Sequence, residues 1–300
     1  LLVASEAPPI RVTKVLKPVE VFDTRDGKRI FDLGQNDAGK ARLKACGKRG
    51  SHIVLRYAEL LTDDKSGVDQ TAIKSFLKSE EFQTEHYIKK SDEPEIWSSH
   101  FTYHGHRYVE VSCLNGDLGE TTLEGLVMHS DLSRRTQFEA SDERLKTLLE
   151  LSHWSTISNM MGLPTSDPHR EKNSWTGDTN IAADQTLLNY DSIQIYLKWL
   201  DDVCDCQRPD GAIPCFCPSP GWGYNWGNGP DWSMALTAIP WRLYLESGNK
   251  KILEKYYPNI LSKRPMTKTQ VAHFNALDEQ TFLGLLLAIE KLILKPGKFP

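Results

Sequence analysis

The spacing of apolar residues along this 300-residue chain changes its period near residue 135. Before that point, short segments such as Ala41–Ala45 and Ile53–Tyr57 alternate apolar and polar residues, and glycine-rich turns separate them. Alternation of this kind directs the apolar side chains to one face of a strand. Many short strands without a long helix between them predict an antiparallel β-sandwich over residues 1–134.

From about Thr136 onward, apolar residues recur at three- and four-residue spacing, which is typical of helices packed on a core. We predict a first helix that has Ser141 as its N-cap and ends near Gly162, followed by helices at 179–189, 192–206, 232–246 and from Lys251 onward. Pro240 lies inside the fourth helix and should bend it. Helices joined by short turns predict an α-helical toroid over residues 135–300, and the apolar run 276–294 predicts one more helix.

Composition narrows the classes of function. A net charge of −4, with 39% hydrophobic and 25% charged residues, describes a soluble globular protein and gives no basic patch for nucleic acid. The longest apolar run, Leu283–Ile289, is too short to cross a bilayer, so we expect no membrane partner. The chain begins Leu1-Leu2-Val3, without a methionine and without the basic and apolar regions of a signal peptide. We therefore expect it to be an excised fragment. Its compartment and its oligomeric state cannot be read from the sequence.

Four of the six cysteines form two Cys-x-Cys pairs, Cys204 with Cys206 and Cys215 with Cys217. Such pairs are compatible with a zinc cluster, with disulfides if the protein is exported, or with small buried thiols in a core. No histidine lies close to them in the sequence. We therefore expect buried thiols and no metal site.

The segment Pro164–Asp178 concentrates side chains that carry chemistry. It contains Asp167, His169, Arg170, Glu171, Lys172, Trp175 and Asp178. Two prolines and a glycine keep most of them off a regular helix, and charged side chains on a loop above a rigid scaffold are typical of catalytic sites. The structural alternative makes Asp178 the N-cap of the next helix, and Glu171 and Lys172 a solvated ion pair.

This segment reads Pro-Thr-x-x-Pro-His-Arg-Glu-Lys-x-x-Trp-Thr-Gly-Asp and resembles the signature loop of the α-L-rhamnosidases, family 78 of the glycoside hydrolases. Upstream, residues 31–36, 57–59 and 101–110 resemble the β domain of that family, with His106 where the family usually has phenylalanine. The resemblance extends to about Tyr257, and residues 263–300 match nothing in it. It implies a β-sandwich followed by the first helices of an (α/α)6 toroid whose second half is missing here.

The resemblance also implies a reaction, the inverting hydrolysis of terminal α-L-rhamnosides without metal or organic cofactor. Inverting glycosidases use two carboxyl groups about 6.5–9.5 Å apart, one acid and one base. By their positions in the family's motif, Glu171 matches the general acid and Asp178 matches an aspartate that binds rhamnose hydroxyls. Trp175 would pack against the apolar face of the sugar. The family usually reads Thr-Asp-Cys-Pro where this chain has 165–168 as Thr-Ser-Asp-Pro, so Asp167 replaces the lost carboxylate only if the loop adjusts.

A second aromatic cluster lies between residues 221 and 232, where glycines allow sharp turns that expose aromatic rings. These tryptophans either pack the core or border the sugar, and the resemblance favours the sugar. The complete set of predicted substrate-binding residues is His169, Arg170, Trp175, Trp222, Trp226, Asp231 and Trp232. No residue can be assigned as the general base.

The expected partner is therefore a rhamnose-containing oligosaccharide or glycoside. Because no general base is assigned, we expect this chain alone to hydrolyse such a substrate weakly or not at all. Three alternatives stay open: a carbohydrate-binding protein without catalysis, an inverting glycosidase for another sugar, and an inert fragment.

Overall fold

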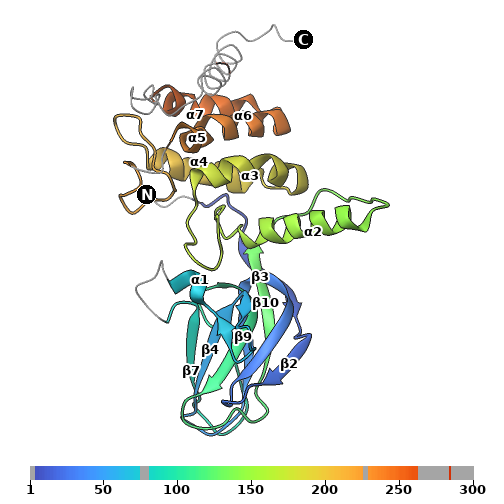
Figure 1. Cartoon of the computed structure of the whole chain (residues 1–300). Helices are drawn as coiled ribbons and strands as arrows, with labels where there is room; N and C mark the ends of the chain where they lie inside the picture. Colours follow the sequence, from blue (N-terminus) through green and yellow to red (C-terminus); the bar gives the residue numbers. More distant parts are fainter. Residues whose placement is uncertain (1–3, 75–80, 226–228, 263–283, 285–300) are drawn as a thin grey trace.

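Strands form the first part of the chain and helices the second, as the lower and upper halves of Figure 1 show. The structure is a computed structural model that describes residues 4–74, 81–225, 229–262 and 284. The last strand ends at Ser130 and the first long helix begins at Glu143. The predicted helix at 276–294 lies outside the described residues.

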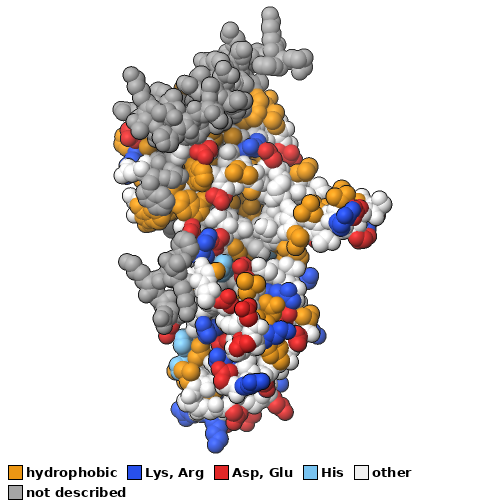
Figure 2. Space-filling view, in the orientation of Figure 1, with side chains coloured by type: hydrophobic (Ala, Val, Ile, Leu, Met, Phe, Trp, Pro, Cys, Tyr) orange, Lys and Arg blue, Asp and Glu red, His pale blue; other side chains and the backbone are white. Residues whose placement is uncertain are grey.

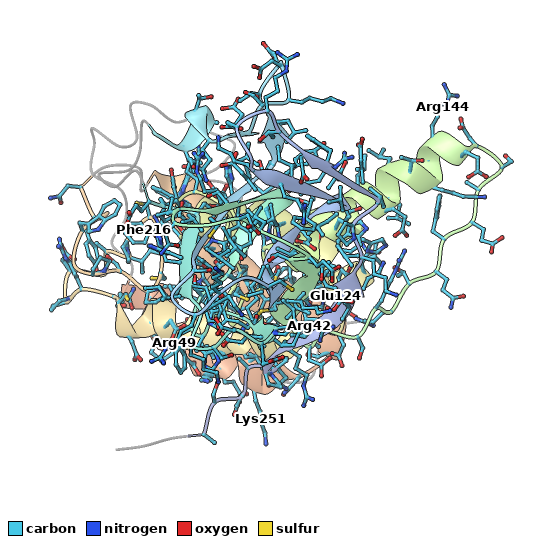
Figure 3. The ribbon with its side chains drawn as sticks, turned by 90° about the horizontal axis from the view of Figure 1, so that it is seen from below. Arg42, Arg49, Glu124, Arg144, Phe216 and Lys251 are labelled. Atoms are coloured by element: carbon cyan, nitrogen blue, oxygen red, sulfur yellow. The ribbon has the colours of Figure 1, made fainter. Side chains whose placement is uncertain are left out.

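The β domain is antiparallel, with the sheet order β1-β10-β3-β9-β4-β7, and both β2 and β8 pair with β3. Its elements are β1 (Ile10–Leu16), β2 (Glu20–Asp23), β3 (Arg29–Ala45), β4 (His52–Ala58), β5 (Leu60–Leu61), β6 (Val68–Asp69), α1 (Thr71–Lys74), β7 (Thr84–Ile88), β8 (Glu95–Trp97), β9 (His104–Cys113) and β10 (Thr122–Ser130). Cross-strand ion pairs brace it. Arg42 of β3 and Glu124 of β10 are register partners, with Arg42 Nε 2.9 Å from Glu124 Oε2, and lie near each other in Figure 3.

The long strand β3 pairs with four other strands of this sheet. Its first half pairs with β2 and β9, and its second half pairs with β10 and β8 and, at Ala38 and Gly39, again with β9. Between the halves the register with β9 shifts between Asp32 and Asp37, and Gly34 takes a positive φ of 74° that favours glycine. The sheet thus curls around a core that includes Phe31, Leu43, Leu55, Val109 and Leu123. The predicted antiparallel fold is confirmed, as one curled sheet that is continuous through β3.

The helical part contains α2 (Glu143–Ser158), α3 (Thr176–Asn189), α4 (Ile193–Asp205), α5 (Pro230–Ser233), α6 (Ala235–Ser247) and α7 (Lys250–Ser262). Trp199, Tyr196 and Leu200 of α4 are fully buried against residues of α6 and α7, because their three- and four-residue spacing gives α4 one apolar face. In Figure 1, α3 to α7 stack together and α2 extends away from them.

The predicted helices are confirmed, with changes at their ends. Asp142 rather than Ser141 caps α2, because its carboxylate accepts a hydrogen bond from the backbone N–H of Arg144 at 2.9 Å. The helix predicted over 232–246 is divided into α5 and α6, and Pro240 lies within α6.

The Cys-x-Cys cysteines are free thiols of the helical part. Cys217 is buried in its core, and Cys204 and Cys206 pack against that core. Within the described residues, no group of three histidine, cysteine, aspartate or glutamate side chains could hold a metal ion. None of the described helices has the length and apolar character needed to cross a membrane.

Candidate active site

Asp167 closes a tight turn in the segment that joins α2 to α3. Its Oδ1 accepts hydrogen bonds from the backbone N–H groups of Arg170 (2.7 Å) and Glu171 (3.3 Å), and its Oδ2 accepts one from Arg170 Nε (2.9 Å). This is the pairing by which aspartate stabilises turns. The turn sets the position of Glu171. A catalytic role for Asp167 and a substrate-binding role for Arg170 stay predictions.

Glu171, Trp175 and Asp178 lie together where α3 begins. Trp175 Nε1 donates a hydrogen bond of 2.7 Å to Glu171 Oε2. Trp175 occupies the N-cap position of α3, so Asp178 lies in the first helical turn and the N-cap alternative for it is wrong. Partial desolvation and then the negative charge of Glu171 raise the pKa of Asp178 above its ordinary value. The charge of Glu171 therefore affects the pKa of Asp178.

Phe216 joins this site through backbone pairing that the sequence did not reveal. Thr176 N–H donates to the carbonyl of Cys215 (2.8 Å), and Cys217 N–H donates to the carbonyl of Ser174 (2.9 Å). The Phe216 ring, labelled in Figure 3, has its centroid 5.4 Å from that of Trp175 and 4.2 Å from that of Trp222. We call Trp175, Phe216 and Trp222 the aromatic strip. The one sequence signal for this pairing is the alternation Cys-Phe-Cys at 215–217, which is compatible with a short extended segment.

Trp232 packs flat against the beginning of α3. A Cβ added to Gly177 would lie 2.6 Å from Trp232 Cδ2, so only glycine fits there. The indole N–H of Trp232 is buried and has no hydrogen-bond partner among the residues that the structure describes. Asp231 is exposed on α5, which packs against α3. Trp226 lies outside the described residues.

His169 and Lys172 face the β domain. His169 Nδ1 lies 3.7 Å from Glu59 Oε2, in the loop that follows β4. Lys172 Nζ donates a hydrogen bond of 2.5 Å to the carbonyl of Tyr103. The alternative in which Glu171 and Lys172 form a solvated pair is therefore wrong, because each binds a different partner. Substrate binding by His169 stays a prediction, and its position beside β9 does not favour it.

Asp178 also borders a pocket of about 430 Å³ between α2 and α3. Hydroxyl and amide groups dominate the polar lining, which includes Thr165, Ser166, Asn159 and Gln185. Among the described residues that line it, Asp178 is the one carboxylate. Ser166, which stands where the family usually has aspartate, bonds the carbonyl of Asn173 at 3.3 Å. The pocket can therefore offer hydroxyl-binding groups and one charge.

The coupling between the two carboxyl groups predicts a measurable shift. Replacing Glu171 by glutamine removes the neighbouring negative charge, so the pKa of Asp178 should fall while desolvation still holds it above its ordinary value. Carbon-13 NMR titration of the Asp178 carboxyl measures this, with Glu150→Gln on α2 as control. An unchanged or higher pKa in Glu171→Gln would contradict the coupling.

Two family models match adjacent parts of the chain. The bacterial α-L-rhamnosidase concanavalin-like domain matches residues 22–129, and the bacterial α-L-rhamnosidase six-hairpin glycosidase domain matches residues 133–281. An α-L-rhamnosidase of Streptomyces avermitilis is 34% identical over 261 residues, covering 86% of this chain and 24% of that protein. One from Formosa agariphila is 29% identical over 275 residues and is covered to 28%.

Solved structures agree with these matches. The α-L-rhamnosidase from Dictyoglumus thermophilum superposes with a TM-score of 0.85 at 28% identity, over 98% of this chain and 35% of that one. The Streptomyces avermitilis enzyme, solved with L-rhamnose, gives 0.78 at 31% identity, over 87% of this chain and 25% of that one. The chain thus spans about a quarter of the curated relatives it matches. It belongs to the α-L-rhamnosidase family, of which it carries the β domain and the start of the six-hairpin helical domain.

Proposed function

We propose that this chain forms the acid-bearing part of an α-L-rhamnosidase active site, in a protein that hydrolyses terminal α-L-rhamnosides with inversion. The observation that carries the proposal is the Glu171 carboxyl group, held at Oε2 by the Trp175 indole N–H at 2.7 Å beside Asp178. All three residues belong to the segment that resembles the family's signature loop. The general base is not assigned.

Each group has a chemical task in this proposal. Glu171 gives its proton to the oxygen of the departing group, and because Trp175 occupies Oε2, we assign Oε1 to the transfer. Asp178 accepts hydrogen bonds from sugar hydroxyls. The aromatic strip offers an apolar surface to the carbon-bound hydrogens and the methyl group of a 6-deoxy sugar.

Binding of L-rhamnose, followed by isothermal titration calorimetry, tests the sugar site. Trp175→Ala and Asp178→Ala should each weaken binding by about tenfold or more, since residues that anchor a ligand contribute at least about 1.4 kcal/mol. Asp184→Ala is the matched control, because Asp184 lies on the same helix, is exposed and pairs with Arg242. No binding of L-rhamnose or of rhamnosides to the unmodified chain would contradict the proposal.

Hydrolysis assays distinguish the proposed rhamnosidase from a glycosidase for another sugar and from a protein that only binds carbohydrate. Hydrolysis of an aryl α-L-rhamnoside should release β-L-rhamnose first if the reaction inverts, which proton NMR detects. A panel of other aryl glycosides tests for a different sugar, and faster cleavage of one of them would reassign the substrate.

A carbohydrate-binding protein without catalysis is the second candidate. It is favoured by Ser166, because a hydroxyl cannot replace the charge of the aspartate that the family usually has there. Saturable rhamnose binding without any release of product would support this candidate over the hydrolase.

A further inference from the structure

Gly105 of β9 lies directly against the backbone of the signature loop. A Cβ added at this position would lie 2.5 Å from His169 Cβ, 2.8 Å from its N and 3.0 Å from its Cα. Gly105 does not have a positive φ, so the absence of a side chain serves close approach and not backbone conformation. Residue 169 therefore rests on the β domain at a point where no side chain fits between the two backbones.

Lys172 makes a second contact between the loop and the β domain. Its ammonium donates to the carbonyl of Tyr103 at 2.5 Å and lies 4.4 Å from the centroid of the Tyr103 ring and 5.3 Å from that of Phe82. Burial lowers the pKa of Lys172 to about 8, although Asp167 of the loop and Glu85 of β7 act to raise it. The Lys172 ammonium therefore ties the residue that follows Glu171 to the β domain, at the cost of partial desolvation.

Beneath these two contacts, buried hydrogen bonds hold β9 in place. His104 Nδ1 lies 2.8 Å from Gln83 Oε1, and His104 Nε2 lies 2.8 Å from Glu85 Oε1. Tyr57 donates to Glu85 Oε2 at 2.7 Å, and Gln83 Nε2 donates to the carbonyl of Gly105 at 2.8 Å. A buried network whose members bond one another is rigid. The β domain thus offers the loop a fixed surface.

We propose that Gly105 and Lys172 are positioning residues, through which the β domain fixes the orientation of Glu171 relative to Trp175 and Asp178. Ordinary contact of a Cβ begins at 3.4 Å, so a methyl group at 105 must push residue 169 away by roughly 1 Å. Glu171 follows two residues later in the same turn and must move with it. Only the catalytic consequence of this displacement rests on the proposed function.

The indole N–H of Trp175 reports the orientation without any need for activity. Its nitrogen-15/proton resonance, assigned with Trp175→Phe, responds to the length of its hydrogen bond to Glu171 Oε2. In Gly105→Ala this resonance should move toward that of a free indole. The matched control is Gly116→Ala, since a Cβ at Gly116 would meet nothing closer than 3.5 Å and that glycine also has no positive φ.

Lys172→Met is a second variant that tests the proposal by the same measurement if Gly105→Ala does not fold. It removes the bond to Tyr103 together with the cost of burying an ammonium, so the Trp175 resonance should move while the melting temperature stays or rises. Lys251→Met, at an exposed position of α7, is its control and should change neither. A Trp175 resonance unchanged in both Gly105→Ala and Lys172→Met would overturn the proposal. Equal movement in the two controls would overturn it as well.

Kinetics provide the catalytic consequence. For a rhamnosidase, both variants should lower kcat by up to about 100-fold with little change in KM, because a donor misplaced by about 1 Å transfers its proton poorly. If the whole protein that contains this chain hydrolysed no rhamnoside, the proposed function would fail. The Trp175 resonance would still decide whether the β domain positions the loop.

Discussion

If Glu171 is the general acid as we propose, replacing it by glutamine in the whole protein that contains this chain should slow the hydrolysis of α-L-rhamnosides with poor leaving groups by about 10²–10⁴-fold, the usual contribution of general acid catalysis. A methoxyphenyl group leaves slowly as an anion and would depend on the proton that we propose Glu171 provides. A dinitrophenyl group leaves without a proton, so its release should be affected much less. The measurement is kcat/KM over a series of aryl rhamnosides for both proteins.

The dependence of the loss in kcat/KM on the leaving group distinguishes a general acid at Glu171 from a residue that only binds the sugar. Glu150→Gln, which removes an exposed carboxylate of α2, should leave the series unchanged. An equal loss for every leaving group in Glu171→Gln would indicate that Glu171 binds the sugar and does not donate the proton.

Replacing Asp37 and His106 together by apolar residues should raise the free energy of unfolding at pH 8 by about 1–4 kcal/mol. The two residues are register partners of β3 and β9, and His106 Nδ1 lies 3.7 Å from Asp37 Oδ1. Both are almost fully buried, and within the described part of the chain neither Asp37 oxygen nor His106 Nε2 has a hydrogen-bond partner. Burial raises the pKa of Asp37 to about 7 and lowers the pKa of His106 to about 3.

These shifts fix the pH dependence of stability. The raised pKa of Asp37 contributes stability that is fully present below its unfolded pKa of 3.8 and is lost as the pH rises to about 7. The lowered pKa of His106 contributes stability that is present above 6.5 and is lost as the pH falls toward 3. An apolar pair should therefore flatten the stability profile at both ends.

Urea unfolding of Asp37→Val/His106→Phe between pH 4 and pH 8 measures the effect. Asp32→Val on the same strand is the contrast, because Asp32 accepts two hydrogen bonds of 2.8 Å from Arg107 and its removal should destabilise the domain. A double variant less stable than the unmodified chain at pH 8 would contradict this account of the buried pair.

Local sequence patterns predicted the helices and the grouping of Glu171, Trp175 and Asp178. In α4, five buried residues repeat with helical spacing, and Ser192 marks its start. Glu171, Trp175 and Asp178 lie within eight positions of one another across a turn and a helix start, so chain connectivity alone brings them close. Such features depend on neighbouring residues, which a sequence displays directly.

Features that depend on distant segments could not be predicted. Phe216 reaches Trp175 through backbone hydrogen bonds between segments some forty residues apart. The contact of Gly105 with His169 joins the β domain to the helical part, and the continuity of the curled sheet through β3 depends on which strands pair. The role of Asp167 in the turn follows from its hydrogen bonds to Arg170 and Glu171. A comparison with the family motif considers only which positions carry a carboxylate, so it does not predict these bonds.

The most direct measurement of the central claim is titration of the nitrogen-15-labelled chain with L-rhamnose while the Trp175 indole resonance is observed. A sugar bound beside Glu171 must disturb the N–H that is bonded to Glu171 Oε2, so the resonance should shift in a saturable way. In the Asp178→Ala variant the same shift should require about tenfold or more L-rhamnose. Saturable rhamnose binding that leaves the Trp175 resonance unmoved would place the sugar elsewhere and contradict the account.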